Sequence, residues 1–461
     1  MRLLRSRLVV TDAILSFDRG TLVLRNSALE DLPGFLWDER STCLRAPAIR
    51  YREVIVAARE RGLPVVDRLA PSLHRPTGPW THPGLRVYQQ DALLAFRAFE
   101  RRGVVVLPTG SGKTRVAVAV LAEAATTALV LCPTRALLQG WKQELGRWYG
   151  GPLGIVGDGE SSIQDITLMT FESGYRHLDR LGDRFGVIVV DEVHHFAGGL
   201  RSEALEMCPA PSRLGLTATP PVHGSAGAAR LAELVGPVVC EVGLRELQGT
   251  HLAELAVVRF AVKLEPAERA AYERAYRPFS TLRGAFLRAN PGSDWLSCVR
   301  AMARTRDGRS AITGFHRAVA IASYNAAKAR ITSELLARHH ADKTLVFTAR
   351  AIDAYAVSTS NLVPAITADI ERTEREDILQ RFRDGRVRTI VSARVLNEGI
   401  DVPDARVAIV IGGALGAREH VQRIGRVLRP APNKRAVVYE LVTDDTLDDA
   451  RARARGAIHA H

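Results

Sequence analysis

Short runs of apolar residues alternate with amphipathic segments over two long stretches of the chain. In the first stretch, from Leu85 to about Val242, each apolar run is followed by a segment with helical spacing. Runs that are apolar throughout, rather than at every second residue, are typical of strands buried on both faces of a parallel sheet. The strands predicted here are Gly103–Leu107, Thr127–Cys132, Asp165–Met169, Gly186–Val190 and Arg213–Leu216. This stretch therefore predicts an α/β domain with helices on both faces of its sheet.

The same alternation resumes at about residue 325, after a mostly helical insert at about 266–320. Residues 1–75 mix short β-like runs such as Gly20–Arg25 with one helical stretch, Arg50–Arg59, and a proline-rich linker follows over 70–83. We therefore predict a small N-terminal α+β domain over 1–75 and α/β domains over 76–242 and 243–461, the second holding the insert. The strands predicted in the last domain are Lys343–Phe347, Val387–Val391 and Val407–Ile411.

The segment Leu107–Thr114, with the sequence LPTGSGKT, lies between a predicted strand and a helical run that extends to Glu123. Glycines let such a loop wrap with its N–H groups toward phosphate, the lysine adds positive charge, and the threonine hydroxyl is a ligand for Mg²⁺. A plain glycine-rich turn is the alternative, and Leu107 stands where the strict pattern has glycine; the flanking elements favour a phosphate-binding loop. The residues predicted to bind ATP here are Thr109, Gly110, Ser111, Gly112, Lys113 and Thr114.

A second cluster of candidate residues follows the predicted strand Gly186–Val190, in the sequence DEVHH. Asp191 would lie at the carboxyl end of that strand, where ligands bind in open α/β sheets, and would hold Mg²⁺ together with Thr114. Glu192 would orient or deprotonate the attacking water. The paired histidines also suggest zinc, but no third ligand accompanies them, so we favour a role of His194 in coupling hydrolysis to movement.

Composition and charge indicate the kind of partner. The chain has 461 residues, a net charge of +13 and five scattered cysteines without a C-x-x-C pair. A strong positive excess favours a polyanion such as nucleic acid, and the cysteine spacing disfavours a zinc site or a disulfide framework. No apolar run is long enough to cross a bilayer, and the N-terminus lacks a signal-peptide core, so we expect a cytoplasmic protein without a membrane partner.

The helical insert carries much of this charge. It contains ten arginines and four acidic residues, a net charge of +6. A solvated helical face is the ordinary explanation of such a run, while a contact with nucleic acid is the alternative that we favour.

A third motif, Gln422–Arg429, has the sequence QRIGRVLR and presents arginines in a pattern suited to a γ-phosphate. Arginines that come from a second domain would complete the ATP site only when the two domains close on each other. Together with the phosphate-binding loop, this motif indicates a motor driven by nucleotide turnover.

These motifs stand in an order that resembles the motif series of superfamily 2 helicases, and within it the XPB helicases of archaea and bacteria. The resemblance extends over about 85–430, with further likeness in the N-terminal segment Leu32–Arg40 to that family's damage-recognition domain. It implies two tandem RecA-like domains, ATP and Mg²⁺ as cofactors, and DNA as the partner. The motifs that carry it begin at Leu85, Leu107, Cys132, Thr170, Asp191, Gly215, Lys343, Val391 and Gln422.

The resemblance also implies roles for single residues. Arg86 and Gln89 would bind the adenine base, while Gly399 and Asp401 would lie near the nucleotide. Catalysis would depend on Lys113, Asp191, Glu192, Arg426 and Arg429, the last two acting as arginine fingers. Coupling would involve His194, Thr217, Thr219 and Gln422. DNA contacts would come from Thr134, Arg135, Thr170, Arg350, Arg394 and, in the insert or "thumb", Arg288, Arg300, Arg304, Arg306 and Arg309.

One departure concerns strand separation. The XPB family carries an Arg-Glu-Asp element shortly after Thr-Ala-Thr-Pro, and here residues 221–227 read PVHGSAG instead. We expect an ATP-dependent 3′–5′ DNA helicase or translocase in DNA repair or related processing, near the nucleoid. The alternatives are an RNA-dependent ATPase and a DNA-stimulated ATPase switch for a partner such as a nuclease or repair protein.

Overall fold

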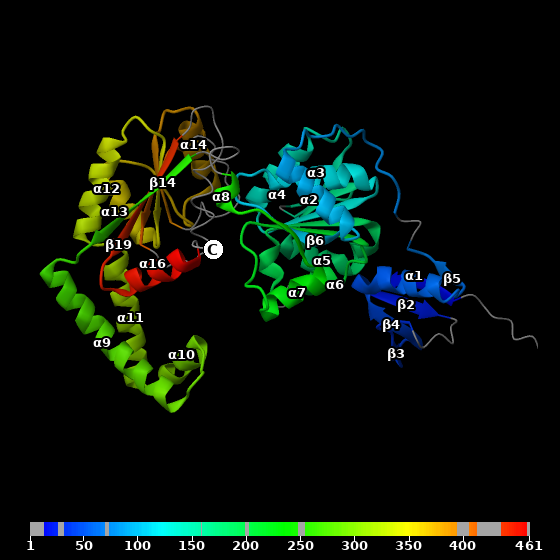
Figure 1. Cartoon of the computed structure of the whole chain (residues 1–461), viewed down its shortest axis with the longest axis horizontal. Coiled ribbons are helices and arrows are strands. Elements are labelled where there is room, and N and C mark those ends of the chain that lie inside the picture. Colours follow the sequence, from blue (N-terminus) through cyan, green and yellow to red (C-terminus); the bar gives the residue numbers. More distant parts are fainter. Residues whose placement is uncertain are drawn as a thin grey trace, which may run out of the picture. The chain divides into compact units, whose positions relative to one another are not determined.

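The computed structural model describes residues 13–25, 32–69, 73–157, 159–198, 202–247, 254–393, 405–412 and 435–458. The chain divides into two compact units, Met1–Glu246 and Leu247–His461, and each unit is described by itself (Figure 1). Among the described residues, we find no helix with the length and apolar character needed to cross a bilayer. The finer division at 75/76 and 242/243 stays a prediction.

The N-terminal part of the first unit is a five-stranded sheet covered by one helix. Helix α1 (Tyr51–Glu60) packs its buried residues Tyr51, Val54 and Ala58 on a core that includes Leu15 and Leu22. The predicted strand at 20–25 and helix at 50–59 are confirmed as β2 and α1. The sheet has the order β3-β4-β2-β1-β5, with β1 (Ala13–Asp18), β2 (Thr21–Arg25), β3 (Leu36–Asp38), β4 (Cys43–Pro47) and β5 (Val65–Asp67).

The rest of the first unit, here called lobe 1, is built on an eight-stranded sheet with the order β13-β6-β12-β11-β7-β10-β8-β9. All neighbouring strands are parallel except β8 and β9. The five strands predicted from apolar runs are confirmed as β6, β7, β10, β11 and β12. The strands are β6 (Arg102–Val106), β7 (Ala128–Cys132), β8 (Leu153–Gly157), β9 (Glu160–Ser162), β10 (Ile166–Thr170), β11 (Val187–Asp191), β12 (Ser212–Thr217) and β13 (Val238–Glu241).

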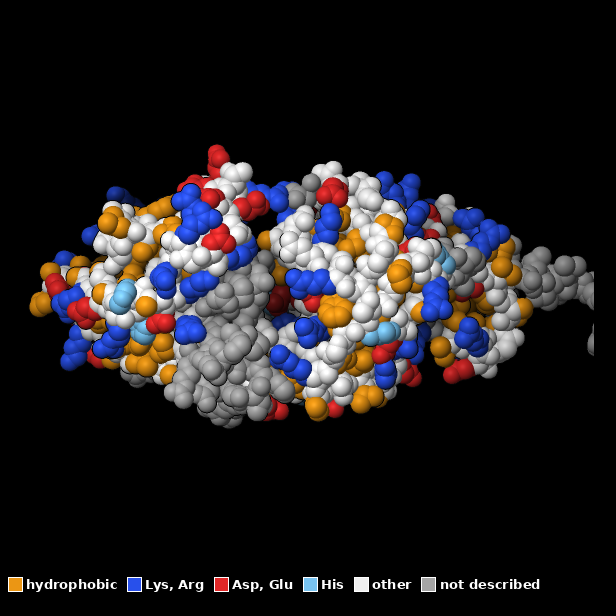
Figure 2. All heavy atoms as spheres, turned by 90° about the horizontal axis from the view of Figure 1, so that it is seen from above, with side chains coloured by type: hydrophobic (Ala, Val, Ile, Leu, Met, Phe, Trp, Pro, Cys, Tyr) orange, Lys and Arg blue, Asp and Glu red, His pale blue; other side chains and the backbone are white. Residues whose placement is uncertain are grey.

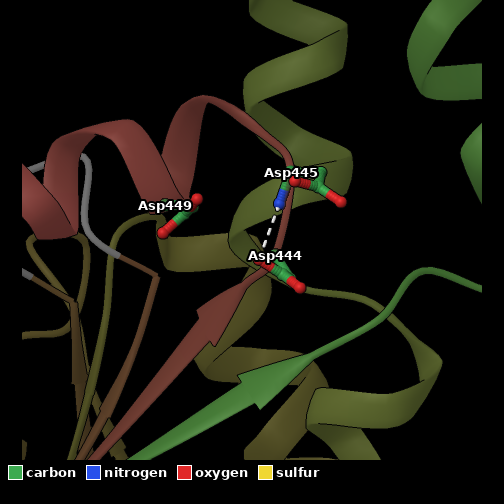
Figure 3. A group of neighbouring side chains, drawn as sticks. All are labelled: Asp444, Asp445 and Asp449. Atoms are coloured by element: carbon green, nitrogen blue, oxygen red, sulfur yellow. Dashed lines mark hydrogen bonds between the residues drawn. The ribbon is translucent and has the colours of Figure 1, made fainter.

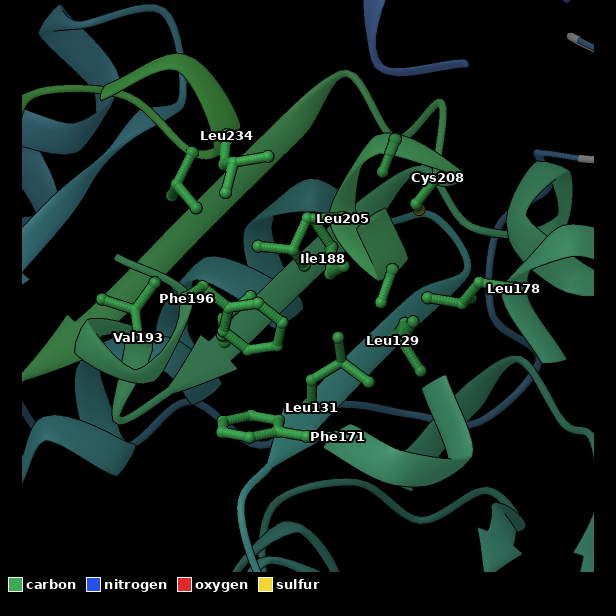
Figure 4. Close-up of a cluster of buried hydrophobic side chains, with 14 of the residues drawn as sticks. Leu129, Leu131, Phe171, Leu178, Ile188, Val193, Phe196, Leu205, Cys208 and Leu234 are labelled. Carbon is green, nitrogen blue, oxygen red and sulfur yellow. The ribbon is translucent and has the colours of Figure 1, made fainter. Parts of the chain in front are cut away.

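Helices cover this sheet because its central strands are apolar on both faces. Figure 4 shows the core on one face, where Leu129, Leu131 and Ile188 from the strands meet Phe171 and Phe196. Phe171 and Phe196 pack edge to face with their ring centroids 4.6 Å apart. The helices are α2 (Val87–Ala98), α3 (Lys113–Ala124), α4 (Arg135–Leu145), α5 (Phe171–Leu181), α6 (Glu203–Glu206) and α7 (Ala226–Leu234), and α8 (Leu244–Leu247) spans the boundary between the units.

The second unit contains lobe 2, a six-stranded parallel sheet with the order β14-β19-β18-β15-β17-β16. The three predicted strands are confirmed as β15, β17 and β18. The strands are β14 (Glu254–Val262), β15 (Thr344–Thr348), β16 (Ala365–Ile366), β17 (Thr389–Ala393), β18 (Val407–Ile411) and β19 (Arg435–Thr443). The helices are α12 (Ala326–Arg338), α13 (Ala351–Asn361), α14 (Arg372–Arg383) and α16 (Leu447–Ile458).

The predicted helical insert is confirmed as three helices, α9 (Pro266–Ala289), α10 (Trp295–Ala303) and α11 (Arg306–Ser323), here called the thumb. Helices α9 and α11 extend side by side away from the lobe 2 sheet, and α10 lies at their far end (Figure 1). A small core of its own holds the thumb together, around Phe279, Met302 and Phe315.

A buried ion pair joins α12, which follows the thumb directly, to the C-terminal helix α16. Lys328, at 0% exposure, lies 2.6 Å from the carboxylate of Asp448, at 4% exposure. The same ammonium donates to the carbonyls of Ala322 and Ser323, the last residues of α11, at 3.0 and 3.3 Å. Asp448 also accepts a hydrogen bond from the backbone N–H of Thr443 at the end of β19. Because each charge is hydrogen-bonded within the protein, burial of the pair is tolerated, and the thumb is fixed to lobe 2.

Candidate active site

The loop that follows β6 has the backbone geometry of a phosphate cradle. Gly110 and Gly112 adopt positive φ angles of 85° and 83°, a conformation that residues with a Cβ rarely adopt. A Cβ at Gly112 would come within 2.7 Å of Gln89 Nε2, so a larger residue there would displace the Gln89 amide. Helix α3 begins directly afterwards, at Lys113, and its N-terminus adds a partial positive charge. The N-terminus of α3, which favours anions, therefore lies at the carboxyl edge of the sheet.

Polar side chains of this loop fit a triphosphate and its metal ion. In the part of the chain that the structure describes, Thr109 Oγ1 is buried and has no hydrogen-bond partner. Lys113 Nζ donates to the carbonyl of Leu107 at 3.1 Å, within its own loop. The lysine, the buried threonine hydroxyl and Thr114 at the second position of α3 form a donor set suited to phosphate and Mg²⁺.

Two side chains of helix α2 hold the loop, and Arg86, which precedes the helix, contacts both of them. Tyr88 donates its hydroxyl to Ser111 O at 2.5 Å, and Gln89 Nε2 donates to the same oxygen at 2.8 Å. Gln89 Oε1 accepts the backbone N–H of Arg86, whose guanidinium reaches the Tyr88 hydroxyl at 3.3 Å. In this structure the Gln89 amide therefore supports the phosphate loop, and the predicted contact of Arg86 and Gln89 with adenine stays a prediction.

Asp191 is the last residue of β11, as predicted, and both oxygens of its buried carboxylate accept hydrogen bonds. Oδ1 accepts the backbone N–H of Glu192 at 3.0 Å, and Oδ2 accepts the indole N–H of Trp141 at 2.9 Å. Burial, with the Asp191 charge as a smaller cause, raises the pKa of the neighbouring Cys132 thiol, which is therefore neutral. The two hydrogen bonds fix the orientation of the Asp191 carboxylate.

Trp141 is a residue that the sequence did not single out. It lies on α4 with Leu138 and Leu145, at a spacing typical of core packing. No sequence spacing indicates that its indole reaches a strand end 50 residues further along the chain.

Glu192, His194 and Thr217 form a connected polar group. Glu192 has a positive φ of 50°, a conformation that costs free energy in a residue other than glycine and that occurs at functional sites. His194 Nδ1 lies 3.0 Å from Thr217 Oγ1 and 3.4 Å from Glu192 Oε2. Thr217 Oγ1 also accepts the N–H of Thr219, and Thr217 O accepts the N–H of Leu107 at 3.0 Å. The structure thus connects the acidic motif, the end of β12 and the start of the phosphate loop.

The residues predicted to contact DNA in lobe 1 lie at the same sheet edge. Thr170 ends β10 and pairs in register with Cys132 at the end of β7, two residues before Thr134. Thr134 and Thr170 cap the N-termini of α4 and α5, accepting N–H groups at 3.3 and 3.2 Å. Arg135 follows Thr134 and is exposed.

Lobe 2 and the thumb hold the other described candidates. Arg350 follows β15, and its guanidinium forms an ion pair with the buried carboxylate of Asp353. Nine of the ten thumb arginines are exposed, including Arg288, Arg300, Arg304, Arg306 and Arg309. Figure 2 shows one face of the protein, over which Lys and Arg side chains are widely spread. The contacts that these residues make with DNA stay predictions.

The remaining predicted site residues lie outside the described residues. They are Arg394, Gly399, Asp401, Gln422, Arg426 and Arg429.

A separate acidic group lies where β19 meets α16. The carboxylates of Asp444, Asp445 and Asp449 come within 4.8 Å of one another, and the backbone N–H of Asp445 donates to Asp444 (Figure 3). Exposed carboxylates often gather in this way without an ion, and no other feature here points to a ligand.

Three family models match the chain. The model described as "Xeroderma pigmentosum group B helicase damage recognition domain" matches residues 15–69. The one described as "Type III restriction enzyme, res subunit" matches 82–222, and "Helicase conserved C-terminal domain" matches 327–431.

Relatives named as XPB proteins match most of the chain. A DNA 3′-5′ translocase XPB2 of Sulfurisphaera tokodaii is 35% identical over 427 residues, which are 92% of this chain and 96% of the relative. A DNA 3′-5′ helicase XPB of Mycobacterium tuberculosis is 29% identical over 80% of this chain and 62% of its own length.

Solved structures show the same fold. Saccharomyces cerevisiae Dbp5 bound to RNA and ADP BeF3 matches 81% of this chain and 87% of its own, with a TM-score of 0.55 and 15% identity. Together with the two parallel sheets, this likeness confirms the predicted tandem RecA-like architecture. The damage-recognition domain, the two helicase domains and the near full-length match to a translocase agree with the predicted motif series, and the chain belongs to the XPB family of superfamily 2 DNA helicases.

Proposed function

We propose that this XPB-family helicase couples Mg²⁺-dependent ATP hydrolysis to 3′–5′ movement along DNA, in DNA repair or a related process at the nucleoid. The observation that carries the proposal is the meeting of three motifs at one sheet edge. Strands β6, β12 and β11 are neighbours and parallel, so the phosphate loop, Thr217 and Asp191 all lie at their carboxyl ends. A parallel α/β sheet binds its ligand at this edge.

The chemical roles follow from the side chains. Lys113 and the N–H groups of its loop would hold the β- and γ-phosphates, while Thr114 and Asp191 would hold the metal ion. When bound, Mg²⁺ supplies positive charge that offsets the charge developing on the transferred phosphate. Glu192 would orient the attacking water and accept its proton.

Arg426 and Arg429 would contribute from the other unit, as would Gly399 and Asp401 near the nucleotide. Arginine fingers are worth about 10³–10⁵ in kcat. An ATP site that needs them turns over only when the two units close, which lets bound DNA control hydrolysis.

His194 would couple ATP binding to movement by linking Glu192 to Thr217. A change in the hydrogen bonding of Glu192 on ATP binding would reach Thr217 through His194, and Thr219 through the Thr217 hydroxyl. The hydrogen bond between Leu107 N–H and Thr217 O would extend this coupling to the phosphate loop. Gln422 would take part from the second unit.

DNA binding would depend on phosphate contacts. Thr134, Arg135 and Thr170 would contact one strand in lobe 1, and Arg350, Arg394 and the thumb arginines would contact the backbone from the second unit. Affinity carried by such contacts falls steeply with salt, because neutralised phosphates release counterions.

The test combines an ATPase assay and a strand-displacement assay. Matched DNA and RNA oligonucleotides are compared as stimulators of ATPase activity, with Lys113→Ala and metal removal by chelation as inactive controls. Stimulation of ATPase activity by DNA supports the proposal, and stimulation by RNA alone would contradict it.

The forked-duplex assay addresses the absent Arg-Glu-Asp element. We expect unwinding or translocation by the isolated chain. DNA-stimulated ATPase without either movement would instead favour a switch that acts on a partner such as a nuclease or repair protein.

A further inference from the structure

The far end of the thumb exposes a tryptophan. Trp295 and Leu296 open helix α10 and are 49% and 50% exposed, whereas the thumb aromatics Phe279 and Phe315 are buried. Contiguous exposed apolar side chains rimmed by polar residues mark interaction sites, and Trp295 and Leu296 are adjacent.

The Trp295 ring is held in place from one side. Its centroid lies 5.5 Å from that of Phe279 and 5.3 Å from that of Phe315. Asp294 caps the helix that carries it, accepting the N–H of Ser297 at 2.8 Å. The buried Cys298, one turn further along α10, anchors the same helix in the thumb core. The ring therefore presents its exposed part with little conformational freedom.

One arginine lies beside this ring, and two more are exposed on or directly after the same helix. Arg283, which is exposed, places its guanidinium carbon 6.0 Å from the ring centroid, within the range of a cation–π contact. Arg300 and Arg304 are exposed on the same helix α10 or directly after it. A partner that satisfies both a flat apolar ring and several arginines needs a π-face and negative charge close together.

Single-stranded DNA has this chemistry in every nucleotide. Its bases stack on aromatic side chains regardless of sequence, and its phosphates pair with nearby arginines. We propose that Trp295 is a base-stacking platform for an unpaired DNA strand, with Arg283 held beside it for the adjoining phosphate. This inference rests on the proposed function, since it requires the thumb to face DNA, and it adds a contact with a base to the backbone contacts expected there.

The experiment measures the affinity of the full chain for a duplex with a single-stranded tail and for the same duplex with abasic sites throughout the tail. Trp295→Ala should weaken binding of the normal tail by about 5- to 100-fold, the range measured for stacking of a base on an aromatic ring. On the abasic tail, wild type and Trp295→Ala should bind alike, because the ring has no base to stack on. An equal loss on both tails would overturn the proposal.

Two variants separate stacking from other roles. Trp295→Phe keeps an aromatic face and should bind the normal tail within about fivefold of wild type. Leu296→Ala removes the neighbouring apolar side chain and should leave DNA affinity unchanged. A loss in Leu296→Ala as large as that in Trp295→Ala would contradict the stacking role, because truncation of any apolar side chain of α10 would then have the same effect.

The proposed function fails in a different way. If wild type bound neither tailed nor blunt duplex, DNA translocation itself would be refuted. If wild type bound tailed duplex and Trp295→Ala bound it equally well, only the stacking platform would be overturned.

Discussion

The proposed nucleotide site in lobe 1 and the thumb differ in how their polar groups are placed. In lobe 1, Asp191 and Thr217 are buried at strand ends and His194 is buried just after β11, and each is held by a defined hydrogen bond. In the thumb, the arginines stand exposed on helices whose small core is aromatic and aliphatic. Buried polar groups act as a unit, because an unpaired partner costs much free energy there. Exposed charges act nearly independently and are screened by salt.

This difference fits the two proposed roles, ATP hydrolysis in lobe 1 and DNA binding by the thumb. Turnover needs fixed atoms at sub-ångström tolerance, so a single substitution in lobe 1 should have a large effect. Holding a polyanion needs many weak contacts, so single substitutions in the thumb should have small effects.

The largest expected effect is that of Arg426→Ala. Loss of an arginine finger should lower kcat by about 10³-fold or more, because the transition-state charge then lacks its counter-charge. ATP binding should survive, since the phosphate loop is intact. Steady-state ATPase assays with DNA, beside nucleotide-binding titrations, measure both. Unchanged DNA-stimulated turnover would refute the finger assignment.

The second prediction concerns the Lys328–Asp448 ion pair next to the thumb, which is buried like the polar groups of lobe 1. Lys328→Met leaves the Asp448 carboxylate buried without its partner and should lower the free energy of unfolding by about 3–5 kcal/mol. The double variant Lys328→Met/Asp448→Leu removes both charges and should regain most of that loss. Thermal unfolding of the two variants is the measurement, and equal stability of single and double variants would contradict this interpretation.

Trp141→Phe removes the indole donor from Asp191 while it keeps an apolar ring in the core. Partners that orient a metal-binding side chain typically contribute about 10- to 100-fold to metal affinity. We expect the Mg²⁺ concentration for half-maximal ATPase activity to rise by about tenfold. Trp148→Phe is the matched control, because the Trp148 indole donates to Glu144 instead. A similar rise in both variants would show that the Asp191 contact has no special role.

Single thumb arginines should have smaller, additive effects. Arg300→Gln or Arg304→Gln should weaken DNA binding equally for all sequences and reduce the slope of log K against log salt by about 1. The double variant should show the sum of the two changes. Arg330→Gln, exposed on α12 outside the thumb, serves as the control. Loss of nearly all DNA binding in one of the single variants would contradict the view that the exposed thumb arginines act independently.

The smallest effect concerns the linker that enters lobe 1. Asp165 accepts the N–H and hydroxyl of Thr77 and pairs with His74, and the backbone N–H of Thr77 is the main cause that lowers the pKa of this carboxyl. A lowered pKa in the folded state gives stability that is present above the unfolded value of about 3.9 and is lost as pH falls below it. Thermal unfolding at about pH 6 and pH 3 should therefore differ less in Asp165→Asn than in wild type.

The sequence by itself determined the central strands, the phosphate loop and the position of Asp191 at a strand end. Each of these depends on local pattern: continuous apolar runs for buried strands, glycines for positive φ, and an acid directly after a run. The sequence also predicted a mostly helical insert at about 266–320, but not its division into α9, α10 and α11.

Only the tertiary structure decided which of these elements meet. The indole of Trp141 reaches Asp191 because α4 packs beside β10 and β7, and β7 is the neighbour of β11. Lys328 pairs with Asp448, which lies 120 residues further along the chain. Strand β14 is the edge strand of its sheet and pairs with β19. Such contacts are set by strand order, register and helix packing, which are properties of the whole chain that no short segment encodes.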